Sequence, residues 1–348
     1  MRFFTRAAAL VGLVFLASAC AKPVDDAPVF NDDMLIFFSP LPERMEIEAR
    51  PATKEQIDLG RMLYFENRLS KNHDISCNSC HDLNTFGVDN KKFSPGHKGE
   101  LGGRNSPTVY NAGEYVAQFW DGRAADLEEQ AQGPILNPVE MAMPDGDTVV
   151  ATLKTIPGYV EAFKKAFPGQ EDPVTYDNLG AAIGAFERGL MTPGRFDKFL
   201  KGDKAALTAD EVKGLALFAT LGCTTCHNGP AVGGSSFQRI GQIIPYDDTK
   251  DLGRFDVTKQ AADKSVFKVP SLRNIEKTGP YFHNGRFDTL EETVRTMAKH
   301  QLGRTLKDGE IKSLVTFLKS LTGEPPKDYI AKPKLPESGP DTPKPDPN

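Results

Sequence analysis

Two short motifs constrain this chain of 348 residues more than any other feature of its sequence. They are Cys77-Asn-Ser-Cys80-His81 and Cys223-Thr-Thr-Cys226-His227. Two thiols separated by two residues and followed at once by a histidine are typical of covalent c-type haem attachment. A zinc ribbon is disfavoured, because the two motifs lie far apart and each ends in a histidine. We therefore expect two covalently bound haem c groups, with His81 and His227 as axial ligands of the iron atoms.

Residues 1–20 have the pattern of an export signal. Arg2 and Arg6 are followed by a short apolar stretch that is too short to span a membrane. Small residues then lead to Cys20, where cleavage by a signal peptidase and lipidation as a bacterial lipoprotein are both open. We expect a periplasmic protein that attaches to a membrane only if Cys20 is lipidated. The other four cysteines belong to the two motifs, so a disulfide framework is not expected.

The composition favours a globular protein with a protein partner. Hydrophobic residues make up 39% and charged residues 26% of the chain, which is normal for a soluble globular protein. The formal net charge is −5, and haem propionates would make it more negative. Because there is no broad basic excess, nucleic acid is not an expected partner. A positively charged or dipolar protein fits this charge better.

We expect a mainly α-helical fold with two cytochrome c-like domains related by internal duplication. Phe119-Trp-Asp-Gly-Arg123 followed by Leu127-Glu-Glu matches Phe282-His-Asn-Gly-Arg286 followed by Leu290-Glu-Glu without a gap. Around the two domains the composition indicates an extended arm and a Pro-rich tail that is extended or disordered. The expected limits are 21–50 for the arm, 51–200 and 201–323 for the N- and C-terminal haem domains, and 324–348 for the tail.

Capping boxes and apolar periodicity predict the helices. Thr53 and Thr208 each begin a capping box, so we expect one helix to start at each. Another helix is expected to begin at Asp126 or just after it. Further amphipathic helices are expected over residues 147–168, 177–191, 289–301 and 308–321.

The two copies differ where the second axial ligand of the iron is expected. Met297 follows the helix start at Leu290 and is the expected sixth ligand of the C-terminal haem, although such a methionine can also be a core residue. The gapless match puts Pro134 at this place in the first copy, and proline cannot ligate iron. The N-terminal haem is therefore expected to be open or to take a ligand from elsewhere. His97, on a loop flanked by glycines, is the expected donor, with a surface histidine as the alternative.

Three more side chains are candidates for work at the haem groups. Glu140 lies six residues after Pro134 and can move a proton during peroxide cleavage. Gln130 can donate a hydrogen bond at the same place. Trp120, the only tryptophan, takes the position of His283 in the second copy and is expected to couple the two haem groups. The alternatives are a solvated acid, an exposed helix residue and a core aromatic residue, respectively.

Together these residues resemble the bacterial di-haem cytochrome c peroxidases over about residues 50–325. The resemblance is specific, because it includes several longer stretches besides the two haem motifs. These are Gly96-His97, Arg104-Asn-Ser-Pro-Thr108, Gln118-Phe-Trp-Asp-Gly-Arg123, Val139-Glu-Met141, Val269-Pro-Ser-Leu-Arg273 and Met297-Ala-Lys-His-Gln-Leu-Gly303.

The resemblance implies a role for each haem. The N-terminal haem would be the low-potential peroxidatic site, with His97 as its removable ligand and Glu140 and Gln130 as the peroxide-activating pair. The C-terminal haem with Met297 would be the high-potential site of electron entry, and Trp120 would lie between the two.

The resemblance also implies a calcium ion between the domains. Its protein ligands would be the side chain of Asn105 and the backbone carbonyls of Thr278 and Pro280, and oxygen donors suit a hard cation. From the residues alone, Thr278-Gly-Pro280 is equally well a simple turn. A homodimer is expected by analogy only.

We therefore expect an enzyme, a cytochrome-c peroxidase that reduces hydrogen peroxide to water with electrons from a small periplasmic cytochrome c or cupredoxin. His97 is expected to be bound at rest and released by one added electron. A related di-haem oxidase that matures a tryptophan-derived quinone is one alternative, disfavoured by Met297, where that group has a tyrosine. A non-catalytic electron carrier is the other, disfavoured by Pro134 and Glu140, because a pure carrier has no use for an open, acid-lined haem.

Overall fold

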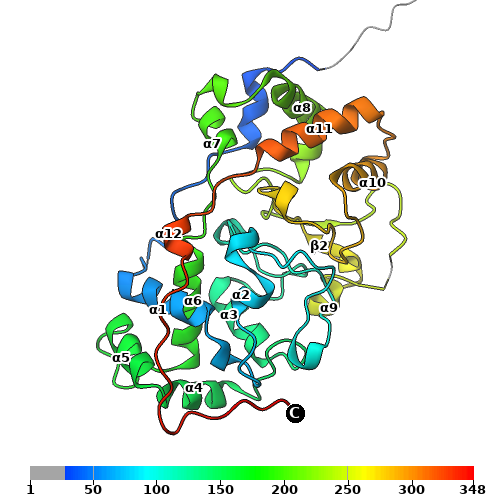
Figure 1. The fold of residues 1–348 in the computed structure, drawn as a ribbon. Helices are drawn as coiled ribbons and strands as arrows, with labels where there is room; N and C mark the ends of the chain where they lie inside the picture. The colour runs from blue at the N-terminus through cyan, green and yellow to red at the C-terminus, as the bar shows by residue number, and fades with distance from the viewer. Residues whose placement is uncertain (1–27, 50, 249) are drawn as a thin grey trace, which may run out of the picture.

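The computed structural model describes residues 28–49, 51–248 and 250–348, so the export signal with Cys20 and the first part of the expected arm lie outside the described residues. The described chain is mainly helical, as expected, and forms two halves that lie one above the other in Figure 1. A two-stranded antiparallel sheet, β1 (Phe237–Arg239) with β2 (Val266–Lys268), lies in the second half. The helices of the first half are α1 (Lys54–Tyr64), α2 (Cys77–Cys80), α3 (Leu127–Leu136), α4 (Gly146–Lys154), α5 (Pro157–Ala166) and α6 (Tyr176–Glu187). The later ones are α7 (Arg195–Leu200), α8 (Ala209–Thr220), α9 (Phe255–Thr258), α10 (Leu290–Leu302), α11 (Asp308–Ser320) and α12 (Lys327–Ile330).

Both predicted capping boxes are confirmed. The side chain of Thr53 accepts a hydrogen bond from the backbone of Gln56 at the start of α1, and Thr208 does the same with Glu211 at the start of α8. Asp126 caps α3, so the helix expected at or just after this residue begins at Leu127. Each cap satisfies a backbone N–H group that has no partner within its helix.

The single helix expected over residues 147–168 is wrong, because the chain forms α4 and α5 there. Pro157 stands at the first position of α5. A proline has no N–H group to continue the preceding helix but fits well where a new helix begins. The helix expected over 177–191 also ends early, since α6 stops at Glu187.

Each half is built on a close crossing of two helices. A Cβ atom added to Gly60 of α1 would lie 1.8 Å from the carbonyl oxygen of Ala182 on α6. A Cβ atom added to Gly214 of α8 would lie 2.1 Å from the carbonyl oxygen of Ser313 on α11. The two glycines therefore let the helix backbones approach at equivalent places in the two halves.

Two hydrophobic clusters form the cores of the halves. The first gathers buried residues of α1 and α3–α6, and the second gathers residues of α7, α8, α10 and α11. Phe196 and Phe199 of α7 pack in the second cluster, close to the expected domain limit at residue 200. Phe38 of the arm also packs there, against Phe196 and Phe218.

The C-terminal tail crosses from the second half and follows the surface of the first, as the red trace in Figure 1 shows. The ring of Tyr329 stacks on Phe186 of α6 with centroids 5.1 Å apart. Farther along, Arg68 donates to the carbonyl oxygen of Pro336 at 2.8 Å, and the backbone of Asp346 donates to Lys71 at 3.0 Å. These contacts fix the path of the tail on the first half.

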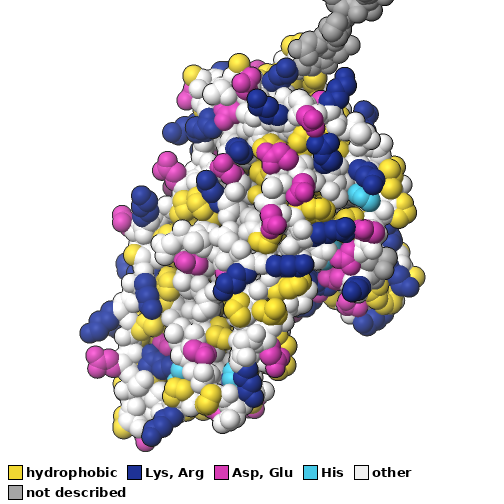
Figure 2. All heavy atoms as spheres, turned by 45° about the vertical axis from the view of Figure 1, so that its right-hand side comes forward, with side chains coloured by type: hydrophobic (Ala, Val, Ile, Leu, Met, Phe, Trp, Pro, Cys, Tyr) yellow, Lys and Arg dark blue, Asp and Glu magenta, His cyan; other side chains and the backbone are white. Residues whose placement is uncertain are grey.

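The surface carries mixed charge. Figure 2 shows Lys and Arg interspersed with Asp and Glu over the visible face. Among the described helices, none has both the length and the apolar character needed to cross a bilayer.

The internal duplication is visible in the backbone. Gln118 forms an antiparallel bridge with Ala124 in the first half, and Tyr281 forms the matching bridge with Phe287 in the second. The residues inside these two turns adopt the same left-handed conformation, with φ of 65° at Phe119 and 70° at Phe282.

The halves meet through reciprocal hydrogen bonds at these turns. The backbone of Asn105 donates to the carbonyl oxygen of His283 at 2.7 Å. The backbone of Lys268 donates to the carbonyl oxygen of Trp120 at 2.8 Å. Since Trp120 matches His283 in the duplicated sequence, Asn105 and Lys268 also occupy equivalent positions. This approximate two-fold relation places the two copies of the motif face to face.

Candidate functional site

Each half contains one large cavity beside its Cys-x-x-Cys-His motif. The two cavities enclose about 1810 Å³ and about 1740 Å³ of atom-free space, counted out to their open mouths. The N-terminal cavity is lined by Cys77, Cys80 and His81, and the C-terminal cavity by Cys223, Cys226 and His227. Their equivalent positions beside the two motifs agree with one group of the same kind in each half.

The side chains of the two motifs fit a covalently attached haem. All four cysteines of the described chain are free thiols, which thioether bonds require. The Nδ1 atom of His81 lies 3.0 Å from the carbonyl oxygen of Pro107, which leaves Nε2 as the nitrogen available for iron. Burial lowers the pKa of His81 and lowers the pKa of His227 to about 4. Both imidazoles are therefore neutral near pH 7, the form that can bind a metal.

The two residues compared as second-ligand positions each line a cavity. Met297 of α10 lines the C-terminal cavity, and Pro134 of α3 lines the N-terminal cavity. At this pair of positions one cavity has a sulfur atom and the other has a side chain that cannot ligate iron, and the ligand role of Met297 stays a prediction.

Glu140 and Gln130 both line the N-terminal cavity. The Oε1 atom of Glu140 accepts a hydrogen bond from Nδ2 of Asn137 at 3.0 Å, which orients the carboxyl group. Burial raises the pKa of Glu140, against weaker opposing effects of Arg123 and Asn137. A raised pKa brings this acid closer to the range in which it can both accept and return a proton.

His97 lies beside the N-terminal cavity rather than among the residues that line it. Its backbone N–H donates to the carbonyl oxygen of Glu140 at 2.8 Å, so its loop is joined to the Glu140 segment. The preceding Gly96 does line the cavity, and a Cβ atom there would lie 1.9 Å from the carbonyl oxygen of Val139. The side chain of His97 is buried, and its Nε2 atom has no hydrogen-bond partner among the described residues. A buried nitrogen of this kind is chemically suited to a metal ligand.

Trp120 stands in the wall between the two cavities and lines both. Its Nε1 atom donates to the carbonyl oxygen of Asn105 at 2.8 Å. Its ring meets His283 edge to face, with centroids 6.3 Å apart. The indole thus contacts both cavities, and its role in coupling the two sites stays a prediction.

The three expected calcium ligands lie at the wall of one cavity. Asn105, Thr278 and Pro280 all line the C-terminal cavity, and Asn105 lines the N-terminal one as well. The Nδ2 atom of Asn105 donates to the carbonyl oxygen of Lys91 at 2.9 Å, which fixes the orientation of its amide. Calcium binding by these oxygen atoms stays a prediction.

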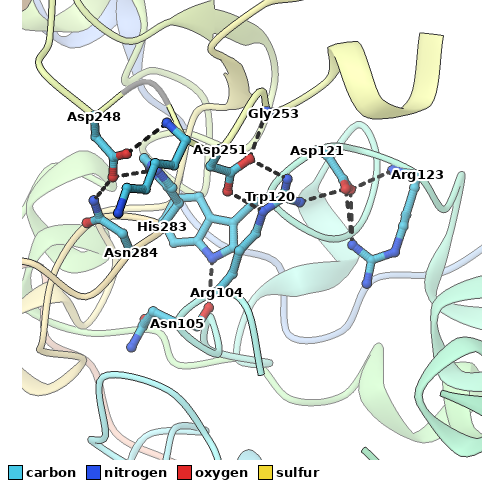
Figure 3. Close-up of polar contacts among 11 residues, drawn as sticks. Arg104, Asn105, Trp120, Asp121, Arg123, Asp248, Asp251, Gly253, His283 and Asn284 are labelled. Carbon is cyan, nitrogen blue, oxygen red and sulfur yellow. Dashed lines mark hydrogen bonds and ion pairs between the residues drawn. The ribbon is translucent and has the colours of Figure 1, made fainter. Parts of the chain in front are cut away.

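A charged cluster between the halves was missed by the sequence reasoning (Figure 3). Arg104 binds both carboxylate oxygens of Asp251, at 2.6 and 2.7 Å, and also contacts Asp121 at 2.6 Å. Arg104 lines the N-terminal cavity, whereas Asp251 belongs to the second half. Arg104 lies in one of the stretches that carry the family resemblance, but no local sequence pattern indicates Asp251 as its partner.

Two buried ionisable side chains of the cavity walls were also missed. Glu187 of α6 lines the N-terminal cavity and is 3% exposed. Lys268 of β2 lines the C-terminal cavity and is 5% exposed. Lys268 directly precedes the Val269–Arg273 stretch of the family resemblance. A lysine between apolar residues is the sequence signal that could have indicated its burial.

Comparison with known proteins identifies close relatives. A family model described as di-haem cytochrome c peroxidase matches residues 54–205. The cytochrome c551 peroxidase of Nitrosomonas europaea is 52% identical over 84% of this chain and 87% of its own length. The cytochrome c551 peroxidase of Pseudomonas aeruginosa is 44% identical over 97% of this chain and 98% of its own length. A solved MauG-like protein associated with microbial copper homeostasis aligns with a TM-score of 0.74 and 28% identity, covering 88% of this chain and 98% of that protein.

Proposed function

Because the chain belongs to the di-haem cytochrome c peroxidase family, we propose that it reduces hydrogen peroxide to water with electrons from a small donor such as a cytochrome c. The single observation that carries the assignment of the reacting site is the pairing of Pro134 with Glu140 at the N-terminal cavity. This cavity has an acid, and it has Pro134 at the place where the other cavity has Met297.

Glu140 would act as the proton carrier in this reaction. When bound, the haem groups supply redox-active iron that accepts peroxide in the N-terminal cavity and exchanges electrons in both. The carboxylate of Glu140 would take the proton from one peroxide oxygen and return it to the oxygen that leaves as water. Asn137 holds this carboxyl group in place, and Gln130 offers an amide N–H to peroxide in the same cavity.

The proposed electron path begins in the C-terminal half. A methionine ligand raises the potential of a haem, so the site of Met297 suits electron entry. Trp120 lines both cavities and offers the aromatic contact between them. His97 would hold the N-terminal iron at rest and leave it when one electron has entered, with calcium at Asn105, Thr278 and Pro280 supporting the change.

Other features of this proposal rest on the sequence alone. Residues 1–20 favour a periplasmic location, and Cys20 offers an anchor only if it is lipidated. A cupredoxin is an alternative donor, and a homodimer is the expected assembly. The quinone-maturing and electron-carrier alternatives are disfavoured by Met297 and by Glu140, respectively.

The test is peroxide turnover with reduced cytochrome c as donor. We would compare the fully oxidised holoenzyme with the form carrying one added electron, both with calcium and after chelation. Rapid turnover only in the calcium-loaded form with the added electron is the expected result.

Each other outcome removes a defined part of the proposal. Rapid turnover in both redox forms keeps the peroxidase but removes the gating role of His97. Turnover that survives complete calcium removal rejects the role of Asn105, Thr278 and Pro280. No turnover in either form with several donors would favour the carrier or the quinone-maturing oxidase instead.

A further inference from the structure

Lys268 is an unusual residue for the wall of an apolar cavity. It is 5% exposed and is the only buried lysine in the described part of the chain. Its ammonium group lies 4.1 Å from the ring centroid of Tyr115, and none of the described carboxylates pairs with it. The two other buried cations of the described chain, Arg188 and Arg273, are each paired with an acid. An unpaired buried charge is costly, so a charged Lys268 side chain requires an anionic partner.

No carboxylate of the described chain acts on Lys268, because burial is the only cause of its shifted pKa. Asp121 and Asp251 instead hold Arg104, as Figure 3 shows. A contact with the Tyr115 ring alone offsets only part of the desolvation of an ammonium group. Consistent with this, burial lowers the pKa of Lys268 to about 7. The wall thus presents a cation to the cavity and no protein anion to balance it.

The internal two-fold relation pairs Lys268 with a residue of the first half. Lys268 and Asn105 make the reciprocal hydrogen bonds between the halves, so they are equivalent residues. In the first copy this place holds a neutral amide, which is an expected ligand of an exchangeable cation. In the second copy the place holds a lysine, which lines the C-terminal cavity and does not line the N-terminal one.

We propose that Lys268 is the binding partner of a propionate group of the C-terminal haem and the fixed positive charge of that site. The inference rests on the haem sites of the proposed function. Haem c carries two propionates, which are the anions that a group filling this cavity would bring. A charge-assisted hydrogen bond to a carboxylate is the interaction that an otherwise unpaired buried ammonium group requires.

This charge has a consequence for electron flow. A positive charge near a haem stabilises the reduced iron over the oxidised iron, which raises the reduction potential. The N-terminal cavity has the neutral amide of Asn105 at the equivalent position. The charge at this pair of equivalent positions therefore differs in the sense that favours electron entry at the C-terminal site, in addition to the effect of Met297.

The test is a spectroelectrochemical titration of both haems in the holoenzyme. Lys268→Met is expected to lower the midpoint potential of the C-terminal haem, with a smaller change at the N-terminal haem. Lys268→Arg keeps the charge and should restore most of the potential. Lys264→Met is the matched control, because Lys264 is exposed on the same segment and also lies over an aromatic ring, that of Phe255.

Resonance Raman spectroscopy supplies a second readout, since the propionate bending band reports hydrogen bonding to the propionate. This band should shift in Lys268→Met and not in Lys264→Met. If Lys268→Met fails to acquire both haems, Lys268→Gln is measured in its place. An unchanged midpoint potential and an unchanged propionate band in the substituted protein would overturn the proposal. Because neither readout depends on turnover, this failure is distinguishable from a failure of the peroxidase assignment.

Discussion

At the scale of single residues, burial controls the acids of the N-terminal cavity. Glu140 and Glu187 line the same space, and burial is the largest cause of the raised pKa of each. Glu140 is held by Asn137 and joined through its backbone to the loop of His97. Glu187 instead lies on α6, where Arg188 lowers and Glu128 raises its pKa to a smaller extent than burial does. Burial therefore raises the pKa of both acids, but their contacts differ, because only Glu140 is joined to the loop of His97.

The first prediction concerns Glu187, whose pKa is raised from 4.5 to about 8. Between these values the unfolded chain releases the proton of this acid while the folded chain retains it, so folding stability is lost as the pH rises from about 5 to 8. Glu187→Gln cannot ionise in either state and should lack this part of the decline. Thermal unfolding at pH 5 and pH 8 should thus show a stability difference, variant minus wild type, that grows with pH. An equal difference at both pH values would contradict the burial argument.

At the scale of helices and turns, close approach of backbones holds each half together. Gly60 and Gly214 each precede a Cys-x-x-Cys-His motif. Because neither residue has a side chain, two helices can cross closely at each of them. The turns at Phe119 and Phe282 repeat the same backbone conformation and bring the halves into reciprocal contact. The duplicated elements thus position both cavities on the two sides of Trp120.

The second prediction concerns the helix crossing in the first half. Gly60→Ala should destabilise the protein by about 1–3 kcal/mol, because the new methyl group would clash with the carbonyl oxygen of Ala182. Gly309→Ala is the control, since that helical glycine has open space around it and alanine is the better helix former by about 1 kcal/mol. Urea unfolding measures both changes. Equal stability of the two variants would show that the crossing is less tight than described.

Local sequence signals predicted the elements better than their contacts. The capping boxes at Thr53 and Thr208 and the gapless repeat around Trp120 are encoded within a few residues, so they could be found without the structure. The break before Pro157 was missed because apolar periodicity continues across it. The partners Arg104 and Asp251 are 147 residues apart, and only the folded chain brings such residues together.

The site residues, too, divide into those that a local motif indicates and those that depend on contacts in the folded chain. The cysteines and histidines of the two Cys-x-x-Cys-His motifs, Met297 and Glu140 belong to recognisable stretches of sequence, and they line the expected cavities, as does Gln130. The position of His97 beside its cavity depends on how its loop packs on Val139, which no motif encodes. The burial of Lys268 and its equivalence to Asn105 are visible only in the folded chain, so the sequence did not indicate a role for this residue.

At the scale of the whole molecule, several kinds of contact join the two duplicated halves. Backbone hydrogen bonds link the duplicated turns, Arg104 links the halves by charge, and the tail returns from the second half along the first (Figure 1). The tail contacts Arg68 and Lys71, which shortly precede the haem motif at Cys77. The tail therefore supports the half that contains the proposed reacting cavity.

The third prediction concerns this tail. Truncation after Ile330 removes the contacts of Pro336, Ser338 and Asp346 with the first half but keeps Tyr329 on α6. We expect the thermal unfolding midpoint of the N-terminal haem spectrum to fall, with little change for the C-terminal haem. Temperature-dependent visible absorption of the two haems measures this. An unchanged midpoint at the N-terminal haem would mean that the tail only follows the surface.

The central claim is that peroxide is cleaved in the N-terminal cavity with Glu140 as the proton carrier. The most direct measurement is steady-state peroxide turnover of Glu140→Gln beside Glu100→Gln, which removes the same charge from an exposed position on the loop of His97. Glu140→Gln should lose about 10²–10⁴-fold in turnover, the usual contribution of a positioned acid–base group, while both haem spectra stay intact. Glu100→Gln should keep wild-type turnover. Wild-type turnover in a fully haem-loaded Glu140→Gln protein would contradict the claim.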